Sequence, residues 1–213
     1  MTAQQPKLMG YRLGTNPTVF HLVRHATYGL IGHVLAGRTP GHRLNPAGQA
    51  QAAALAASLA ALPIAAIVSS PLERTRETAE AIAAPHGLPV QIEPDLIEID
   101  FGEWTGSAFP ALHALPEWRA FNSFRSSTPI PGGETMLAAQ SRAVAAILRL
   151  RVAHPGSELV VVSHGDVVKA ILAHFLGMPL DLFRRLDIAP GSRSVLALHD
   201  EDAQVRAVNL PSG

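Results

Sequence analysis

Short apolar segments alternate with helical patterns along most of this sequence of 213 residues. The strand-like segments are 18–23, 64–69, 89–93 and 158–163, and the helical ones are 44–62, 70–84, 133–154 and 165–176. Such alternation is typical of a mostly parallel sheet with helices on both faces. We therefore expect an α/β fold, a three-layer α/β/α sandwich, to which 192–198 and 203–208 add a closing hairpin.

Two of the helical patterns carry local signals at their ends. Asn45 is a suitable N-cap for the helix over 44–62, with Pro46 at its first helical position and Pro63 as its stop. The helix over 70–84 is expected to begin with a capping box, in which the side chains of Ser70 and Glu73 bind each other's backbone N–H groups.

Residues 101–132 interrupt this alternation and show little clean periodicity. The segment holds six of the chain's 11 aromatic residues, namely Phe101, Trp104, Phe109, Trp118, Phe121 and Phe124. We expect it to form a cap-like insertion over one end of the sheet, where loops commonly contact ligands. Residues 18–210 are expected to form a single domain that includes this cap, and the polar stretch 1–17 a flexible leader.

Composition excludes several classes of function. The chain has 17 basic and 17 acidic side chains and no basic stripe, so we expect neither nucleic acid nor an anionic membrane as partner. The uncharged window 50–68 is mostly alanine and contains Pro63, which favours a helix followed by a strand over a membrane span. The absence of cysteine excludes disulfides, thiol catalysis and cysteinyl metal sites, and it fits a cytoplasmic protein.

Polar residues that can carry chemistry follow four of the predicted strands. They are Arg24 and His25, the stretch from Ser69 to Arg74, Glu98, and the run Ser163-His164-Gly165. The carboxyl ends of parallel strands meet at one edge of a sheet, so two histidines, two arginines and a carboxylate are expected to converge there.

This set of residue types suits phosphoryl transfer. A neutral imidazole is a nucleophile that can take a phosphoryl group, and arginines hold the negative charge on the equatorial oxygens. A carboxylic acid can protonate the leaving oxygen and later deprotonate water. A metal pair at His164 and Asp166 is the weaker interpretation, because no third ligand stands at a convincing spacing and the arginines would repel a cation.

Six ordered blocks of the sequence give a more specific indication. They are LVRHAT, GRTPGHRLNPAGQAQA, SSPLERTRETA, LIEIDFGEWTG, PGGET and VVVSHGDVVKAIL. Over about residues 18–200 the chain resembles the histidine phosphatase superfamily, the phosphoglycerate-mutase-like group. The variant LAGRTPGHRLN is similar to a poorly characterised bacterial subgroup often labelled probable phosphomutase.

The resemblance implies a phosphoglycerate-mutase-like catalytic domain and a role for each matching residue. It implies His25 as nucleophile, Glu98 as general acid and base, and His164 as a third catalytic residue. It places Arg24 and Arg74 at the phosphate, with Arg38 and Gly165 as further phosphate contacts. It implies no metal and no cofactor, a small phosphate ester as the partner, and leaves a homodimer open.

Three functions agree with this pattern. A metal-independent phosphomonoesterase acting through a phosphohistidine is the first, a phosphoglycerate-type phosphomutase is the second, and a phosphate-binding module without turnover is the third. The last is motivated by the first block, where Ala26, Tyr28 and Ile31 replace the glycine, hydroxyl and asparagine that are commonest in the family. Glu103 and Asp100 compete with Glu98 for the acid, although the family pattern matches at Glu98.

Overall fold

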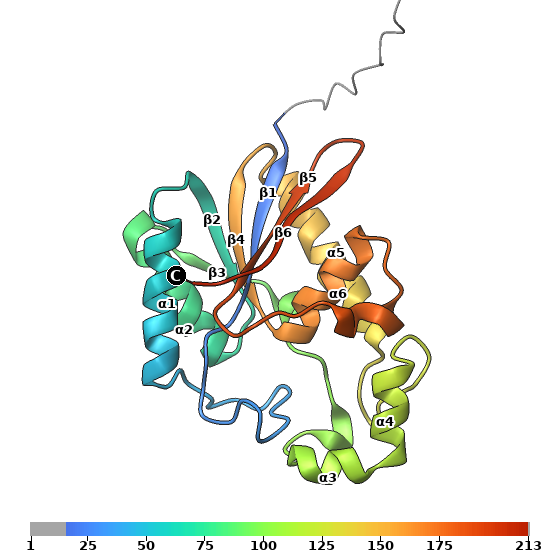
Figure 1. Ribbon diagram of the computed structural model, residues 1–213. Helices are drawn as coiled ribbons and strands as arrows, with labels where there is room; N and C mark the ends of the chain where they lie inside the picture. Colours follow the sequence, from blue (N-terminus) through green and yellow to red (C-terminus); the bar gives the residue numbers. More distant parts are fainter. Residues whose placement is uncertain (1–15, 213) are drawn as a thin grey trace, which may run out of the picture.

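The computed structural model describes residues 16–212, and the expected leader lies almost wholly outside that range. A six-stranded sheet runs through the molecule in the order β3-β2-β4-β1-β5-β6 (Figure 1). Its strands are β1 (Thr18–Arg24), β2 (Ile64–Ser69), β3 (Val90–Ile92), β4 (Glu158–Ser163), β5 (Arg193–Leu198) and β6 (Ala203–Leu210). The first four are mutually parallel, and β5 and β6 run antiparallel as the expected hairpin.

Helices cover both faces of this sheet. Helices α1 (Pro46–Leu59) and α2 (Glu73–Ala83) lie on one side in Figure 1, and α5 (Met136–Ala153) and α6 (Gly165–Phe175) lie on the other. In the central strand β4, Leu159 and Val161 pack into the core beneath α5 and α6, whereas Val160 and Val162 pack into the core beneath α1 and α2. This alternation at period two is what a strand buried on both faces requires. The three-layer α/β/α prediction is confirmed.

Of the two predicted helix starts, the N-cap of α1 is confirmed and the capping box of α2 is not. The Asn45 side chain accepts a hydrogen bond from the Gly48 N–H at 2.8 Å, as expected for the N-cap of α1. The capping box at Ser70 is wrong, because α2 begins at Glu73 with Leu72 in the cap position. The Ser70 hydroxyl is instead hydrogen-bonded to His164, which is a tertiary contact that local sequence could not reveal.

The segment 101–132 forms a small helical cap. It contains the 3-10 helix η3 (Gly102–Trp104) and the helices α3 (Phe109–Ala114) and α4 (Pro116–Ser123). In Figure 1, α3 and α4 lie beyond the end of the sheet toward which β1 runs, near the loop that follows β1. Trp104, Trp118 and Phe121 form an aromatic cluster in this cap, and Trp104 and Trp118 meet edge to face with centroids 5.3 Å apart.

The remaining short helices are η1 (Ala84–His86), η2 (Pro94–Leu96) and η4 (Leu180–Arg185). Helix η2 precedes the loop that carries Glu98, and η4 follows α6 and packs against it. Within residues 16–212, none of the helices has the length and apolar character needed to span a membrane.

Candidate active site

His25 and His164 follow two neighbouring parallel strands. Strand β1 ends at Arg24 and β4 at Ser163, and these two residues are partners in the strand register. The His25 N–H donates to the Ser163 carbonyl at 2.9 Å, which extends the alignment one residue beyond β1. The two imidazole rings meet edge to face with centroids 5.3 Å apart. Parallel pairing of β1 and β4 therefore brings both histidines to one edge of the sheet.

The His25 imidazole is held in its nucleophilic form. Its Nδ1 lies 2.9 Å from the Ala26 carbonyl, and because a carbonyl only accepts, the proton resides on Nδ1 and the lone pair on Nε2. Burial, together with the cations Arg74 and Arg24, holds the pKa of His25 well below its usual value. His25 is therefore neutral over the physiological range of pH, with Nε2 free to attack.

Arg24 and Arg74 present N–H groups that have no partner among residues 16–212. Arg74 is 1% exposed; its Nη2 donates to the Gly37 carbonyl at 2.8 Å, whereas its Nε and Nη1 are buried and unpaired. The Arg24 Nη1 donates to the Ile188 carbonyl at 2.6 Å, and its Nε is unpaired. Buried donors without acceptors cost about 1–3 kcal/mol each. Both guanidinium groups are therefore suited to an anion held between them.

Gly165 allows Arg24 to approach the first turn of α6. A Cβ at this position would lie 3.1 Å from Arg24 Nε and 3.2 Å from its Cζ, so any larger residue would displace the guanidinium. Gly165 is the first residue of α6, and no side chain caps that helix. Its first backbone N–H groups are therefore available to an anion at the end where the helix dipole favours one.

His164 is fully buried between Ser70 and Glu98. Its Nε2 is 2.8 Å from the Ser70 hydroxyl, and its Nδ1 is 3.8 Å from Glu98 Oε2. Burial and the nearby cation Arg74 lower the pKa of His164 well below its usual value. Ser70 belongs to the stretch from Ser69 to Arg74 that was expected at this edge of the sheet, but no role was predicted for it.

The Glu98 carboxyl is the acidic group nearest to this pair. Burial, and secondarily the charge of Asp166, raise its pKa from an ordinary 4.5 to about 7. Oε1 accepts a hydrogen bond from the Ile99 N–H at 2.9 Å, which fixes one oxygen. A carboxyl with a pKa near neutrality can give and take a proton at physiological pH, as a general acid and base must.

A cavity of about 300 Å³ lies at the edge of the sheet beneath the cap, and neither His164 nor Ser70 is among the residues that line it. His25, Arg24, Arg74, Glu98 and Gly165 all line it. The cap contributes Phe101, Phe109, Trp118, Asn122 and Arg125, so residues 101–132 do border the site. Asp166 and Lys169, on α6, complete the polar part of the wall.

The same architecture is found in known proteins. The family model described as histidine phosphatase superfamily (branch 1) matches residues 20–211. The chain belongs to the histidine phosphatase superfamily.

Three proteins illustrate what this chain is similar to. An uncharacterized protein of Mycobacterium tuberculosis is 37% identical over 193 residues, which cover 90% of this chain and 95% of that protein. Phosphoserine phosphatase 1 of Hydrogenobacter thermophilus is 30% identical over 169 residues, covering 78% of this chain and 80% of the relative. The crystal structure of a putative alpha-ribazole-5'-P phosphatase from Escherichia coli superposes with a TM-score of 0.82 at 27% identity, covering 91% and 97% of the two chains.

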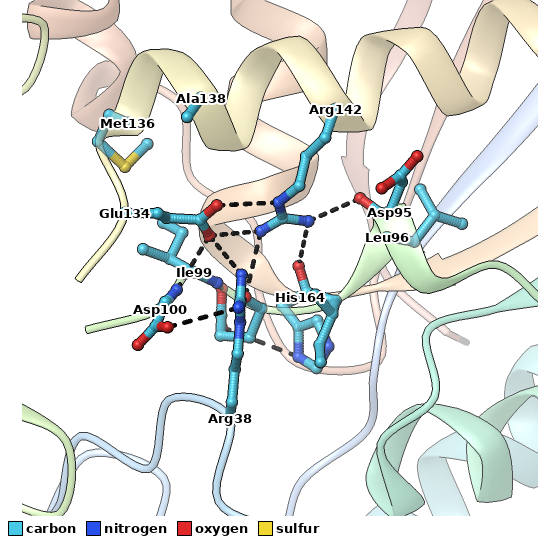
Figure 2. A network of polar contacts seen from close by, with 12 residues as sticks. Arg38, Asp95, Leu96, Ile99, Asp100, Glu134, Met136, Ala138, Arg142 and His164 are labelled. Atoms are coloured by element: carbon cyan, nitrogen blue, oxygen red, sulfur yellow. Dashed lines mark hydrogen bonds and ion pairs between the residues drawn. The ribbon is translucent and has the colours of Figure 1, made fainter. Parts of the chain in front are cut away.

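In this member of the superfamily, Arg38 does not line the cavity. Its Nε donates to the Glu98 carbonyl at 2.8 Å and its Nη2 to Glu134 Oε1 at 2.8 Å, while Nη1 lies 3.5 Å from Asp100 (Figure 2). Two carboxylates, Glu134 and Asp100, hold its guanidinium, and Arg38 as a phosphate contact stays a prediction. Arg38 contacts the main chain of Glu98.

Arg142, from α5, contacts the same stretch of main chain. It donates to the carbonyls of Asp95, Ile97 and Glu98 at 2.6, 2.7 and 3.2 Å, and to both oxygens of Glu134 (Figure 2). Glu134 Oε1 also accepts from the Asp100 N–H at 2.9 Å. Two arginines and one glutamate therefore hold the loop that carries Glu98 from both sides. Glu134 lies in the quoted block PGGET, but its function was not predicted.

The three departures in the first block have different consequences. Ala26 is fully buried and its N–H donates to the Thr78 hydroxyl at 3.0 Å; it is not among the residues with positive φ in the described chain, so the backbone tolerates a methyl group. The Tyr28 ring lies 5.2 Å from Arg74 Cζ and packs against His25 at 5.4 Å, which supports both groups. Ile31 contributes an apolar part of the cavity wall.

Within residues 16–212, no group of three His, Asp or Glu side chains is placed to hold a metal ion.

Proposed function

We propose that this protein is a phosphomonoesterase that transfers the phosphoryl group of a small ester to His25 and then to water. The observation that supports this most directly is the juxtaposition of a neutral His25, two guanidinium groups with unpaired donors, and a carboxyl of pKa about 7 around one cavity. Similar proteins named phosphatases favour hydrolysis over isomerisation.

In the first step, His25 Nε2 attacks phosphorus and the bond from phosphorus to the ester oxygen breaks. Arg24, Arg74 and the first N–H groups of α6 donate to the equatorial oxygens, where negative charge must be held. Glu98, protonated, gives its proton to the leaving alkoxide. The positive charge that develops on the imidazole is stabilised by the Ala26 carbonyl, which accepts a hydrogen bond from Nδ1–H.

In the second step, water takes the place of the alcohol. Glu98, now ionised, accepts a proton from the water as its oxygen attacks phosphorus. The bond between phosphorus and Nε2 breaks, His25 returns to its neutral form, and Glu98 is protonated again. His164, held by the Ser70 hydroxyl, lies beside the ring of His25 and close to the Glu98 carboxyl.

The test is trapping of the phosphoenzyme. Brief reaction with a phosphate ester, followed by denaturation, should give an acid-labile and alkali-stable phosphate on His25. His25→Ala should lower phosphate release by at least about a thousandfold, as expected when a nucleophile is lost. His154→Ala, in the turn between α5 and the start of β4, serves as the matched control and should retain activity.

Two outcomes would contradict the proposal. Full activity of His25→Ala would exclude it as nucleophile. Isomerisation of a phosphoglycerate that outpaces phosphate release would favour a phosphomutase instead, and ligand binding without turnover on a broad panel of phosphate esters would favour a binding module.

A further inference from the structure

The carboxylate of Asp166 stands where the proposed mechanism needs room for an anion. Asp166 is the acidic residue in the first turn of α6, directly after Gly165, and it lines the same cavity as His25. The backbone N–H groups of this turn and the helix dipole favour a negative charge there, and Asp166 already supplies one. A phosphoryl group at this end of α6 is therefore repelled by the carboxylate unless another charge offsets it.

Arg125 of the cap supplies such a charge. It follows α4 in the sequence, and its Nη1 donates to Asp166 Oδ2 at 2.8 Å. The two side chains are only 7% and 23% exposed, so solvent screens this ion pair weakly. Burial raises the pKa of Asp166, but the charges of Arg125 and Lys169 outweigh this effect and hold the pKa below its usual value. Asp166 is therefore ionised at neutral pH.

The cap holds the Arg125 guanidinium in place. Its Cζ lies 4.5 Å from the centroid of the Phe121 ring and 4.3 Å from that of the Phe183 ring. The next residue, Ser126, donates from its N–H and its hydroxyl to the two carboxylate oxygens of Asp181, at 2.8 and 2.9 Å. The charge of Arg125 therefore reaches α6 only while this part of the cap is docked against η4.

Hydrogen bonding by itself does not account for Arg125. Its Nη2 donates to Asn122 Oδ1 at 2.8 Å, but its Nε is buried and has no partner among residues 16–212. A buried donor without an acceptor costs stability. An arginine in this place is therefore not explained by the stability of the cap alone, and its positive charge beside Asp166 needs a second reason.

Asp166 also acts on the proposed general acid. After burial, its charge is the second cause that raises the pKa of Glu98. Further charged or titratable groups bear on these two carboxyl groups, namely Arg24 of β1, Arg74 of α2, Arg125 of the cap, His164 after β4 and Lys169 of α6. The carboxylate that opposes a bound phosphate thus helps Glu98 to keep its proton, so the site requires its charge to be offset rather than removed.

We propose that Arg125 is a positioning residue of the cap, which holds the Asp166 carboxylate and offsets its charge so that α6 can accept a phosphoryl group. This inference rests on the proposed phosphatase reaction and gives the cap a part in it. Because Arg125 belongs to the cap, the phosphate site is complete only when the cap is docked. Arg125 does this through Asp166, without contacting the substrate.

Binding of inorganic phosphate, measured by calorimetry at pH 8, tests the offset without any turnover. Arg125→Met should raise the Kd for phosphate about tenfold, because it leaves the charge of Asp166 uncompensated. Asp166→Asn should bind phosphate at least as tightly as the wild-type protein. The decisive variant is Arg125→Met/Asp166→Asn, which removes both charges and should return the Kd to within about twofold of the wild-type value.

Two further variants serve as controls. Arg125→Lys keeps the positive charge and should retain most of the phosphate affinity. Arg184→Met removes an exposed cation beside the cap that does not line the active-site cavity, and it should bind phosphate as the wild-type protein does. Circular dichroism spectra and melting temperatures establish that each variant is folded, and Arg125→Gln replaces the methionine variant should that one destabilise the chain.

The pH profile gives a readout that a merely structural role would not change. Asp166→Asn should move the alkaline limb of kcat/KM for glycerol 3-phosphate to lower pH, because the charge of Asp166 helps to hold the proton on Glu98. Arg125→Met should move this limb to higher pH, because the same charge is then no longer offset.

The outcomes separate this inference from the proposed function. A double variant that binds phosphate as weakly as Arg125→Met would overturn the offset and indicate that Arg125 contacts the ligand or only stabilises the cap. Unchanged phosphate affinity in Arg125→Met would also overturn it and would leave the phosphatase proposal intact. The expected order of affinities in a protein that releases no phosphate from esters would support the offset and contradict the proposed function.

Discussion

At Glu98, the raised pKa that suits the proposed acid-base role lowers the stability of the folded protein. Burial raises the pKa of this carboxyl to about 7, so the folded protein retains a proton that the unfolded chain loses above pH 4.5. Between these two pH values the unfolded state binds fewer protons than the native state, and the free energy of unfolding falls as pH rises. The proposed general acid is therefore kept protonated at a cost in stability at neutral and alkaline pH.

Glu98→Gln should reveal this cost. The amide is always neutral, so the variant should match the wild-type stability at pH 4 and exceed it at pH 8. Each pKa unit is equivalent to about 1.36 kcal/mol, so the gain is up to about 3 kcal/mol. Urea unfolding at both pH values measures it. A variant that is equally stable, or less stable, at pH 8 would show that the carboxyl is not held protonated by the fold.

At the scale of elements, the loop after η2 is positioned by contacts with α5 and with the loop after β1. Arg142 and Arg38 both donate to the Glu98 carbonyl, and Glu134 holds the two guanidinium groups together. None of these three side chains lines the cavity. These three side chains influence the proposed reaction only by positioning Glu98. Their substitution should therefore slow the reaction most for substrates whose leaving oxygen must be protonated.

Glu134→Gln should therefore affect substrates unequally. An alkyl phosphate needs its leaving oxygen protonated, whereas p-nitrophenyl phosphate does not, so we expect kcat to fall about tenfold for the first and less than about threefold for the second. Glu80→Gln, which removes an exposed pair with Arg76, is the control and should affect neither. Equal losses on both substrates would indicate a structural defect rather than a displaced acid.

At the scale of the whole molecule, the cap and the sheet share hydrophobic contacts. The second core cluster joins Leu112, Trp118 and Phe121 of the cap to Met136 of α5 and Phe183 of η4. Residues of α6, which covers the sheet, belong to the same cluster. The cap therefore gains its stability from helices that also bury the sheet, and we expect it to unfold together with them.

Both tryptophans of the chain, Trp104 and Trp118, lie in this cap cluster, which makes the expectation measurable. Unfolding followed by tryptophan fluorescence should coincide with unfolding followed by circular dichroism at 222 nm. Phe121→Ala, which truncates a fully buried ring, should shift both transitions together by about 3–5 kcal/mol. A fluorescence transition that precedes the loss of helix would show a cap that opens independently.

The sequence by itself determined the layered fold and the edge of the sheet at which the candidate site residues lie. The alternation of apolar strands with capped helices specifies a parallel sheet, and the residues after 18–23 and 158–163 then have to meet at its carboxyl edge. The sequence alone therefore predicts that His25, His164, Arg24 and Arg74 lie together.

Only the tertiary structure decided which polar side chain meets which. The Ser70 hydroxyl is hydrogen-bonded to His164 rather than to the first turn of its own helix, and Arg38 contacts Glu98 and Glu134. Lys169 looks like an ordinary helix residue until α6 places it on the cavity wall. Sequence periodicity predicts which face of a helix or strand is buried. The partners of long polar side chains depend instead on distances and charges between elements that are far apart in the sequence, so no local pattern predicts them.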